Sequence, residues 1–223
     1  MASYYNLIEY DSDSEGPIIV SMSNLTAAAI FMTGVLQRAS IPYGLMGGLA
    51  VRYIGGKSHT KDVDMAFQAG MRRLWEVVEV EPRLTIPNTR LISNIMKDFV
   101  RTGPGYDSCV QNMEVEVDLI ESGFQNSPRD LAETIMMHTI PSDAGPVQIR
   151  GISLLYLLRG KMAAFAGRAQ TSDMQDIQTI LLNRLEEVRG FVGSLEPLGV
   201  DVFLERMPRQ NQGYWRSFFA RCF

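Results

Sequence analysis

The chain has 223 residues, of which 46% are hydrophobic and 21% charged, a composition typical of a globular protein and not of a disordered one. Its formal net charge of −4 argues against a protein that mainly coats nucleic acid, and no apolar run reaches the roughly 18 residues of a membrane span. Two cysteines, Cys109 and Cys222, lack the spacing of a disulfide framework, so we expect free thiols and a cytoplasmic protein.

The chain opens with a short acidic segment that is followed by a helical pattern. Residues 1–17 are rich in acidic residues and serine, and we expect a mobile N-terminal arm there. From Ser23 to about Ser40, apolar residues recur three and four positions apart. This spacing predicts an amphipathic helix with Ser23 or Asn24 as its N-cap.

A strand, a glycine pair and a helix are predicted next. Residues 41–46 (IPYGLM) form the expected strand, and residues 49–54 (LAVRYI) form the helix. Gly47 and Gly48 lie between them, where the unpaired N–H groups at the start of a helix cradle anions. Glycine at this place lets a phosphate approach the backbone closely, although such a pair is more often only a tight turn.

Two later segments alternate between polar and apolar residues, which is the pattern of half-buried strands. They are residues 62–67 (DVDMAF) and 113–120 (MEVEVDLI). Between them we predict helices over 71–80 and 89–100, and a loop at 102–106.

Helical patterns dominate the last third of the chain. Residues 152–168 and 172–188 are strongly helical, and no strand pattern interrupts them. We therefore expect an α/β domain over 18–145 and a helical domain over 146–223.

Asp62 and Asp64 are the first candidates for chemistry. Alternate residues of a strand point to the same face, so the two carboxylates lie side by side, roughly 7 Å apart at the backbone. Neighbouring carboxylates repel each other, and either a raised pKa or a divalent cation relieves that repulsion. Oxygen ligands on a rigid strand suit Mg²⁺. An isolated pair of this kind, however, is more often the solvent face of an edge strand.

The second strand offers a third carboxylate if the two strands are neighbours. Glu114, Glu116 and Asp118 share one of its faces. Two-metal phosphoryl transfer uses three such acids to hold cations about 3.5–4 Å apart. We select Asp118 over Glu116 because its shorter side chain, near the end of the strand, fits a compact site. Glu114 and Glu116 are equally compatible with solvated edge charges.

The loop before the aspartate pair carries groups that bind phosphate. Lys57, Ser58, Thr60 and Lys61 supply ammonium and hydroxyl donors beside the carboxylates. His59 belongs to no cluster with metal-ligand spacing, so we expect it to be an exposed loop residue and assign no zinc.

Together these residues resemble the signature of the nucleotidyltransferase superfamily with the DNA polymerase β-like fold. The matching positions are Met46, Gly47, Gly48, Asp62, Asp64 and Asp118. The resemblance implies an α+β fold, in which a small mixed β-sheet flanked by helices is followed by a helical C-terminal part. It also implies that the glycine pair meets the phosphates of a nucleotide and that the acids hold Mg²⁺.

The helical part resembles that of the minimal, toxin-like and antibiotic-modifying members, in which a lysine precedes an arginine and an aspartate pair. Lys161, Arg168, Asp173 and Asp176 match this order. At 100° per residue, Lys161 and Arg168 fall on an apolar helix stripe, where charges require partners. We expect Arg168 and Asp173 to form a buried ion pair, whereas the resemblance implies that Lys161 reaches a triphosphate.

Residues 213–223 (GYWRSFFARCF) interleave arginines with aromatic residues. Such mixtures stack nucleic-acid bases in some proteins. We expect this segment to dock onto its own domain or onto a partner subunit, and the second arrangement would give a homo-oligomer.

The leading hypothesis is a Mg²⁺-dependent nucleotidyltransferase that moves a nucleoside monophosphate from an NTP to an acceptor hydroxyl or phosphate and releases pyrophosphate. The expected catalytic and metal-binding residues are Asp62, Asp64 and Asp118, and the expected nucleotide-binding residues are Gly47, Gly48, Ser58, Thr60 and Lys161. The acidity of the chain favours a small-molecule or protein acceptor over RNA. The alternative is a non-catalytic nucleotide-binding or interaction module with the same fold.

Overall fold

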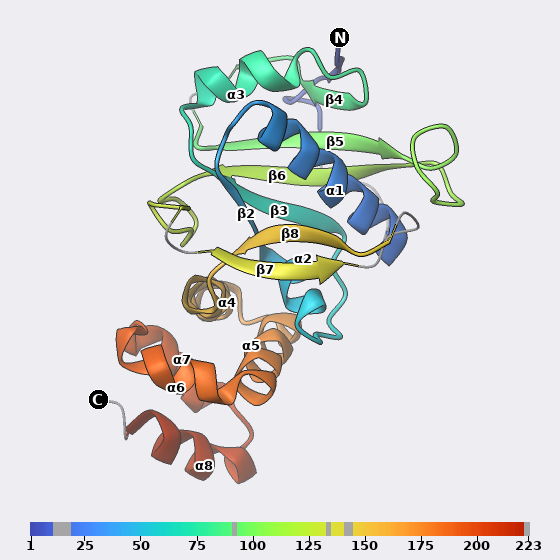
Figure 1. The fold of residues 1–223 in the computed structure, drawn as a ribbon. Coiled ribbons are helices and arrows are strands. Elements are labelled where there is room, and N and C mark those ends of the chain that lie inside the picture. The colour runs from blue at the N-terminus through green and yellow to red at the C-terminus, as the bar shows by residue number, and fades with distance from the viewer. Residues whose placement is uncertain (11–18, 91–92, 133–134, 141–144, 221–223) are drawn as a thin grey trace.

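The computed structural model describes residues 1–10, 19–90, 93–132, 135–140 and 145–220. One mixed β-sheet carries helices on its faces, and further helices follow at one end (Figure 1). This architecture confirms the predicted α+β fold with a helical C-terminal part.

The sheet has eight strands in the order β1-β4-β5-β6-β3-β2-β8-β7. In chain order they are β1 (Ser3–Tyr5), β2 (Tyr43–Met46), β3 (Asp62–Phe67), β4 (Leu84–Pro87), β5 (Ile95–Thr102), β6 (Met113–Glu121), β7 (Ile135–Ile140) and β8 (Val147–Ile152). The central pair β3 and β6 is parallel, and β2 and β5 flank it in antiparallel pairing.

The helices fall into two groups. Around the sheet lie α1 (Met22–Arg38), α2 (Gly47–Tyr53) and α3 (Met71–Val78), and α1 crosses one face of the sheet in Figure 1. The second group comprises α4 (Leu154–Arg168), α5 (Thr171–Asn183), α6 (Leu185–Phe191), the short 3₁₀ turn η1 (Val192–Ser194), α7 (Pro197–Arg206) and α8 (Arg209–Ala220). These helices gather beyond β7 and β8 (Figure 1).

The helix predicted over 89–100 is wrong, because β5 occupies residues 95–102. Alternate residues of β5 are buried, namely Met96, Asp98, Val100 and Thr102. This is the period of a strand, and the antiparallel ladder to β6 fixes it by pairing all eight residues of β5.

The sheet also extends further along the chain than the sequence suggested. β8 pairs with β2 beyond residue 145, and β7 pairs with β8. The helical part therefore starts at α4, with Ser153 as its N-cap. At the other end, Ser3–Tyr5 of the expected mobile arm form β1, which pairs with β4 at the sheet edge, and 11–18 lie outside the described residues.

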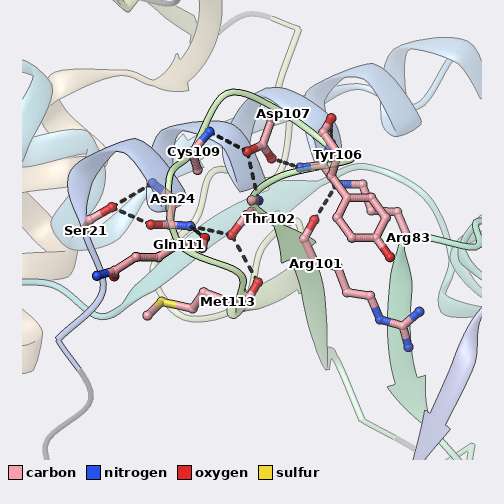
Figure 2. A network of polar contacts seen from close by, with 11 residues as sticks. Ser21, Asn24, Arg83, Arg101, Thr102, Tyr106, Asp107, Cys109, Gln111 and Met113 are labelled. Carbon is pink, nitrogen blue, oxygen red and sulfur yellow. Dashed lines mark hydrogen bonds and ion pairs between the residues drawn. The ribbon is translucent and has the colours of Figure 1, made fainter.

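The N-terminus of α1 is tied to the β5–β6 hairpin by a polar network (Figure 2). The N-cap is Ser21, not Ser23 or Asn24, because the Ser21 hydroxyl accepts from the backbone N–H of Asn24 at 3.2 Å. Asn24 is instead buried, and its amide donates to Thr102 Oγ1 at 2.7 Å and to the Gln111 carbonyl at 3.0 Å. The Asn24 side chain, which was expected to cap α1, therefore links α1 to the sheet instead.

The loop between β5 and β6 is held by Asp107, which is also drawn in Figure 2. Its carboxylate accepts from the backbone N–H of Gly103 at 2.9 Å and of Cys109 at 3.0 Å, and it pairs with Arg83. These bonds to the charged form lower the pKa of Asp107 against the opposing effect of burial. The hairpin that carries the third carboxylate is therefore rigidly closed.

The aromatic C-terminal segment packs on the protein itself. Trp215, Phe218 and Phe219 of α8 are buried, and Phe219 contacts Phe203 of α7 with ring centroids 6.4 Å apart. Over 213–220, docking onto its own domain is therefore confirmed, although Tyr214 is exposed, and 221–223 lie outside the described residues. Within the described residues, no helix has the length and apolarity that crossing a bilayer requires.

Candidate active site

A third carboxylate was expected if the two acidic strands are neighbours, and β3 and β6 are adjacent in the sheet. Their parallel register sets Asp64 opposite Asp118 and Asp62 opposite Glu116. Paired residues of parallel strands project to the same face, so four carboxylates share one side of the sheet. The other face of β3 carries Val63 and its apolar neighbours into the core.

Asp118 differs from the other two acids of β6, because its cationic neighbour, Lys97 Nζ, lies 3.9 Å from Oδ1 and makes no hydrogen bond to it. Among the described residues nothing donates a hydrogen bond to its buried Oδ1. Glu116, by contrast, pairs with Lys97 and accepts from the Tyr10 hydroxyl at 3.0 Å. Glu114 accepts from Thr85 Oγ1 at 2.9 Å. The available lone pairs therefore lie on the residue that faces Asp64.

Burial and mutual repulsion disfavour the charged state of these acids. Burial, and then the charges of Asp62 and Asp118, raise the pKa of Asp64 to about 7, while Lys161 and Arg168 oppose the shift. The pKa of Asp118 is raised to about 6, again mainly by burial. A cluster that resists ionisation without a counter-charge is suited to take up a cation.

The glycine pair at the start of α2 makes room for the acids. Gly47 has φ +67°, and a Cβ at this position would lie 1.7 Å from Asp64 Oδ2. A Cβ at Gly48 would lie 2.7 Å from Thr60 Oγ1. Thr60 in turn donates to Asp62 Oδ1 at 2.8 Å. The glycines are thus needed for the close approach of the acidic strand, whatever ligand they meet.

The structure separates the predicted phosphate-binding residues of the preceding loop. Thr60 and Lys61 line the cleft beside the acids, and so does His59. Ser58 is not among the lining residues, because its hydroxyl donates to the backbone carbonyl of Ser172 on α5 at 3.3 Å. Ser58 therefore joins the loop to the helical part.

Four charged residues of α4 and α5, namely Lys161, Arg168, Asp173 and Asp176, form one network that borders the cleft. Arg168 donates two hydrogen bonds to Asp173, at 2.7 and 2.8 Å, so the predicted pair forms, but only Asp173 is buried and the Arg168 side chain is 54% exposed. Lys161 is buried, and its Nζ lies 2.8 Å from Asp176 Oδ2 and 3.8 Å from Asp173 Oδ1. The lysine expected to meet a triphosphate thus has a carboxylate partner already.

These elements surround an open cleft with a volume of about 1210 Å³. Its walls come from the sheet face, the 59–61 loop, the loop after β6, and α4 and α5. Sequence analysis missed several residues that line it: Tyr10, Phe99, Gln125, Asn126 and Tyr156. The alternation within β5 was the one signal that pointed to Phe99, and the predicted helix over 89–100 concealed it.

The donor chemistry of the site fits Mg²⁺. Carboxylate oxygens are the ligands that this hard cation takes, and Asp118 presents an unpartnered oxygen beside Asp64. In the described part of the chain, however, no three His, Cys, Asp or Glu side chains are grouped closely enough to hold a metal ion. Asp62, Asp64 and Asp118 are therefore the residues that would hold the ion, without a preformed coordination sphere.

No family model and no curated protein sequence matches this chain. A solved structure of an antigenic nucleotidyltransferase-like protein from Paracoccidioides brasiliensis matches with a TM-score of 0.62 at 17% identity, over 90% of this chain and 94% of that chain. The antibiotic-resistance factor ANT(2'')-Ia matches with a TM-score of 0.47 at 14% identity, over 90% and 96% of the two chains.

The nucleotidyltransferase toxin MenT4 of Mycobacterium tuberculosis matches with a TM-score of 0.48 at 15% identity, over 88% of this chain and 82% of that chain. At these sequence identities the similarity shows the fold alone. Of the three matches described, the protein from Paracoccidioides brasiliensis, with a TM-score of 0.62, is the one similar enough in shape to support a conclusion about the fold. That match covers the sheet and the helical part together. The chain therefore has the nucleotidyltransferase fold.

Proposed function

We propose that this protein is a Mg²⁺-dependent nucleotidyltransferase that transfers a nucleoside monophosphate from an NTP to an acceptor hydroxyl or phosphate. The observation that carries the proposal is the register pair of Asp64 and Asp118, two half-buried carboxylates in a cleft between sheet and helices. The similarity in fold to a nucleotidyltransferase-like protein supports it.

The carboxylates assemble the reacting groups. Mg²⁺ bound by Asp62, Asp64 and Asp118 would neutralise the triphosphate and favour ionisation of the acceptor hydroxyl. Asp118 accepts the proton of that hydroxyl at Oδ1, to which no described residue donates a hydrogen bond. The acceptor oxygen then bonds to the α-phosphorus, the bond from that phosphorus to the bridging oxygen breaks, and pyrophosphate leaves.

The remaining residues orient the triphosphate. Gly47 and Gly48 leave the backbone open to a phosphate oxygen, and Thr60, held by Asp62, adds a hydroxyl. Lys161 supplies a positive charge from α4, shared between the phosphates and its carboxylate partners. Ser58 takes no part, because its hydroxyl is engaged with α5.

A small molecule or a protein side chain is the proposed acceptor, with RNA less favoured. Acidic side chains of β3 and β6 line much of the sheet side of the cleft and would repel a polyanion. A non-catalytic nucleotide-binding module is the second candidate. Two observations favour this module. The acids among the described residues do not form a closed metal cluster, and Lys97 Nζ lies 3.9 Å from Asp118 Oδ1.

The test is label transfer from each α-labelled NTP in the presence of Mg²⁺ and a library of acceptors, together with pyrophosphate release. Wild-type protein should transfer label, and the double variant Asp62→Asn with Asp64→Asn should not. Asp201→Asn, an exposed change on α7, is the matched control and should remain active. NTP binding without transfer would select the non-catalytic module, and transfer by the double variant would refute the metal assignment.

A further inference from the structure

A second hollow of about 500 Å³ lies beside the cleft. Asn126 and Tyr156 line both hollows, so they form the shared wall. Gln125 also lines the larger one. Tyr156 precedes Lys161 by five residues, roughly 7.5 Å along the helix axis, and both residues line the larger hollow.

The loop after β6 has an unusual backbone at two exposed amide residues that border the cleft. Gln125 and Asn126 have φ values of 49° and 62°, in the left-handed region that non-glycine residues rarely occupy. The loop is joined to the acidic strand, since the Ser122 N–H donates to the carbonyl of Phe67 at 2.8 Å. It also approaches α4, because a Cβ at Gly160 would lie 4.0 Å from Asn126 Cβ.

Tyr156 presents an oriented aromatic ring at this wall. The guanidinium carbon of Arg159 lies 5.6 Å from the centre of the ring. Arg159 is itself held by Glu196 of α7 at 2.6 Å. An aromatic face of this kind stacks on any nucleic-acid base, whatever its sequence identity.

An asparagine beside such a ring supplies the second element of base recognition. Its amide offers both a donor and an acceptor, and it can therefore pair with the edge of a base in two directions. The sheet side of the cleft carries the acids expected to hold the phosphates through Mg²⁺, and the α4 side carries the ring and the amide. One ligand with a charged end and a flat heteroaromatic end matches both sides.

We infer that Asn126 and Tyr156 form the base subsite of the nucleoside triphosphate, in which Tyr156 stacks on the base and the Asn126 amide selects it by its edge. The inference rests on the proposed function and extends it, because it assigns nucleotide selectivity to the loop after β6. Phosphate contacts alone treat all four NTPs alike, whereas this subsite does not.

The test is calorimetric binding of the four α,β-methylene NTP analogues with Mg²⁺. Asn126→Asp replaces the amide donor by an acceptor, so affinity should shift by about fivefold or more toward the bases whose facing edge donates hydrogen bonds, and the relative affinities for the four analogues should change. Gln148→Glu is the matched control, since this exposed residue of β8 gives the same charge change outside the cleft.

Tyr156 is tested with the same four analogues. Tyr156→Leu keeps apolar bulk but removes the ring and should weaken all four by about tenfold. Tyr156→Phe keeps the ring and should bind as wild type does. Thermal unfolding checks that each variant is folded.

The outcomes separate the two proposals. If the wild type binds none of the analogues, the proposed function fails and this inference fails with it. If the wild type binds them but Asn126→Asp leaves their relative affinities unchanged, the base subsite is refuted and the transferase proposal stands. The subsite is also refuted if Tyr156→Leu binds as tightly as Tyr156→Phe.

Discussion

Asp64 occupies the space that a side chain at Gly47 would need. The distance from Asp64 Oδ2 to a Cβ at Gly47 would be 1.7 Å, and φ at Gly47 is +67°. The glycine that opens α2 and the acid at the centre of β3 therefore depend on each other. In the function proposed above, this contact would link the backbone proposed to face the phosphates to a carboxylate proposed to hold the metal.

Gly47→Ala should therefore remove activity and destabilise the protein. The new methyl group must displace the Asp64 carboxylate, and the alanine backbone must adopt a left-handed φ. Together these two effects cost about 2 kcal/mol or more of unfolding free energy. Urea unfolding measures the loss, and label transfer measures the activity. Gly213→Ala is the control, because nothing lies within 4 Å of a Cβ there and α8 should gain slightly from alanine. Equal stability of the two variants would contradict this account.

Asp98 should make the protein less stable as the pH rises. It is completely buried on β5, and no described residue hydrogen-bonds to either carboxylate oxygen. Burial, and then the charge of Asp118, raise its pKa well above the ordinary value. The folded state thus keeps a proton that the unfolded state releases, so the contribution of Asp98 to stability is greatest below about pH 4 and declines as the pH rises above it.

Asp98→Val should stabilise the protein near neutral pH by about 1–3 kcal/mol, because it removes an unpaired buried polar group. It should also flatten the pH dependence. Urea unfolding of wild type and variant between pH 4.5 and 8 tests both expectations. A variant less stable than wild type at pH 8 would show that Asp98 has a partner in the folded protein.

Asn24 should contribute to stability through the network of Figure 2. Asn24→Ala removes two hydrogen bonds to the β5–β6 hairpin and leaves the Gln111 carbonyl without this donor. The expected loss is about 1–3 kcal/mol of unfolding free energy. Asn211→Ala, an exposed change on α8, should cost far less. Chemical denaturation compares the two, and similar losses would refute the role of the network.

Lys161 should have separable structural and binding roles. Lys161→Met leaves the buried Asp176 without its ion-pair partner and should destabilise the fold by about 3–5 kcal/mol. Adding Asp176→Asn should restore most of the stability, because the uncompensated charge is gone.

The rescued double variant should still bind NTP analogues more weakly than wild type, because it lacks the ammonium group of Lys161. Calorimetric titration with Mg²⁺ measures this binding, and unfolding confirms the rescue. Wild-type affinity in the rescued protein would assign Lys161 a purely structural role.

The sequence by itself determined the features that depend on local periodicity. Alternation along β3 placed Asp62 and Asp64 on one face, and helical spacing placed Arg168 where it needed a partner such as Asp173. These predictions held because each rests on the geometry of a single element or of two elements joined by a short turn. The aromatic pattern of α8 likewise predicted packing, either on the protein's own domain or on a partner subunit, and the structure shows the first.

Only the tertiary structure decided which elements meet. The order of the strands and the register of β6 on β3 brought Asp118, and not Glu116, opposite Asp64, and long-range packing sets that register. The same reason explains the wrong helix at 89–100, since pairing with β6 outweighs the local preference of that segment. It also explains why Asn126 and Tyr156 went unrecognised: a loop residue and a helix residue share a wall only after the chain has folded.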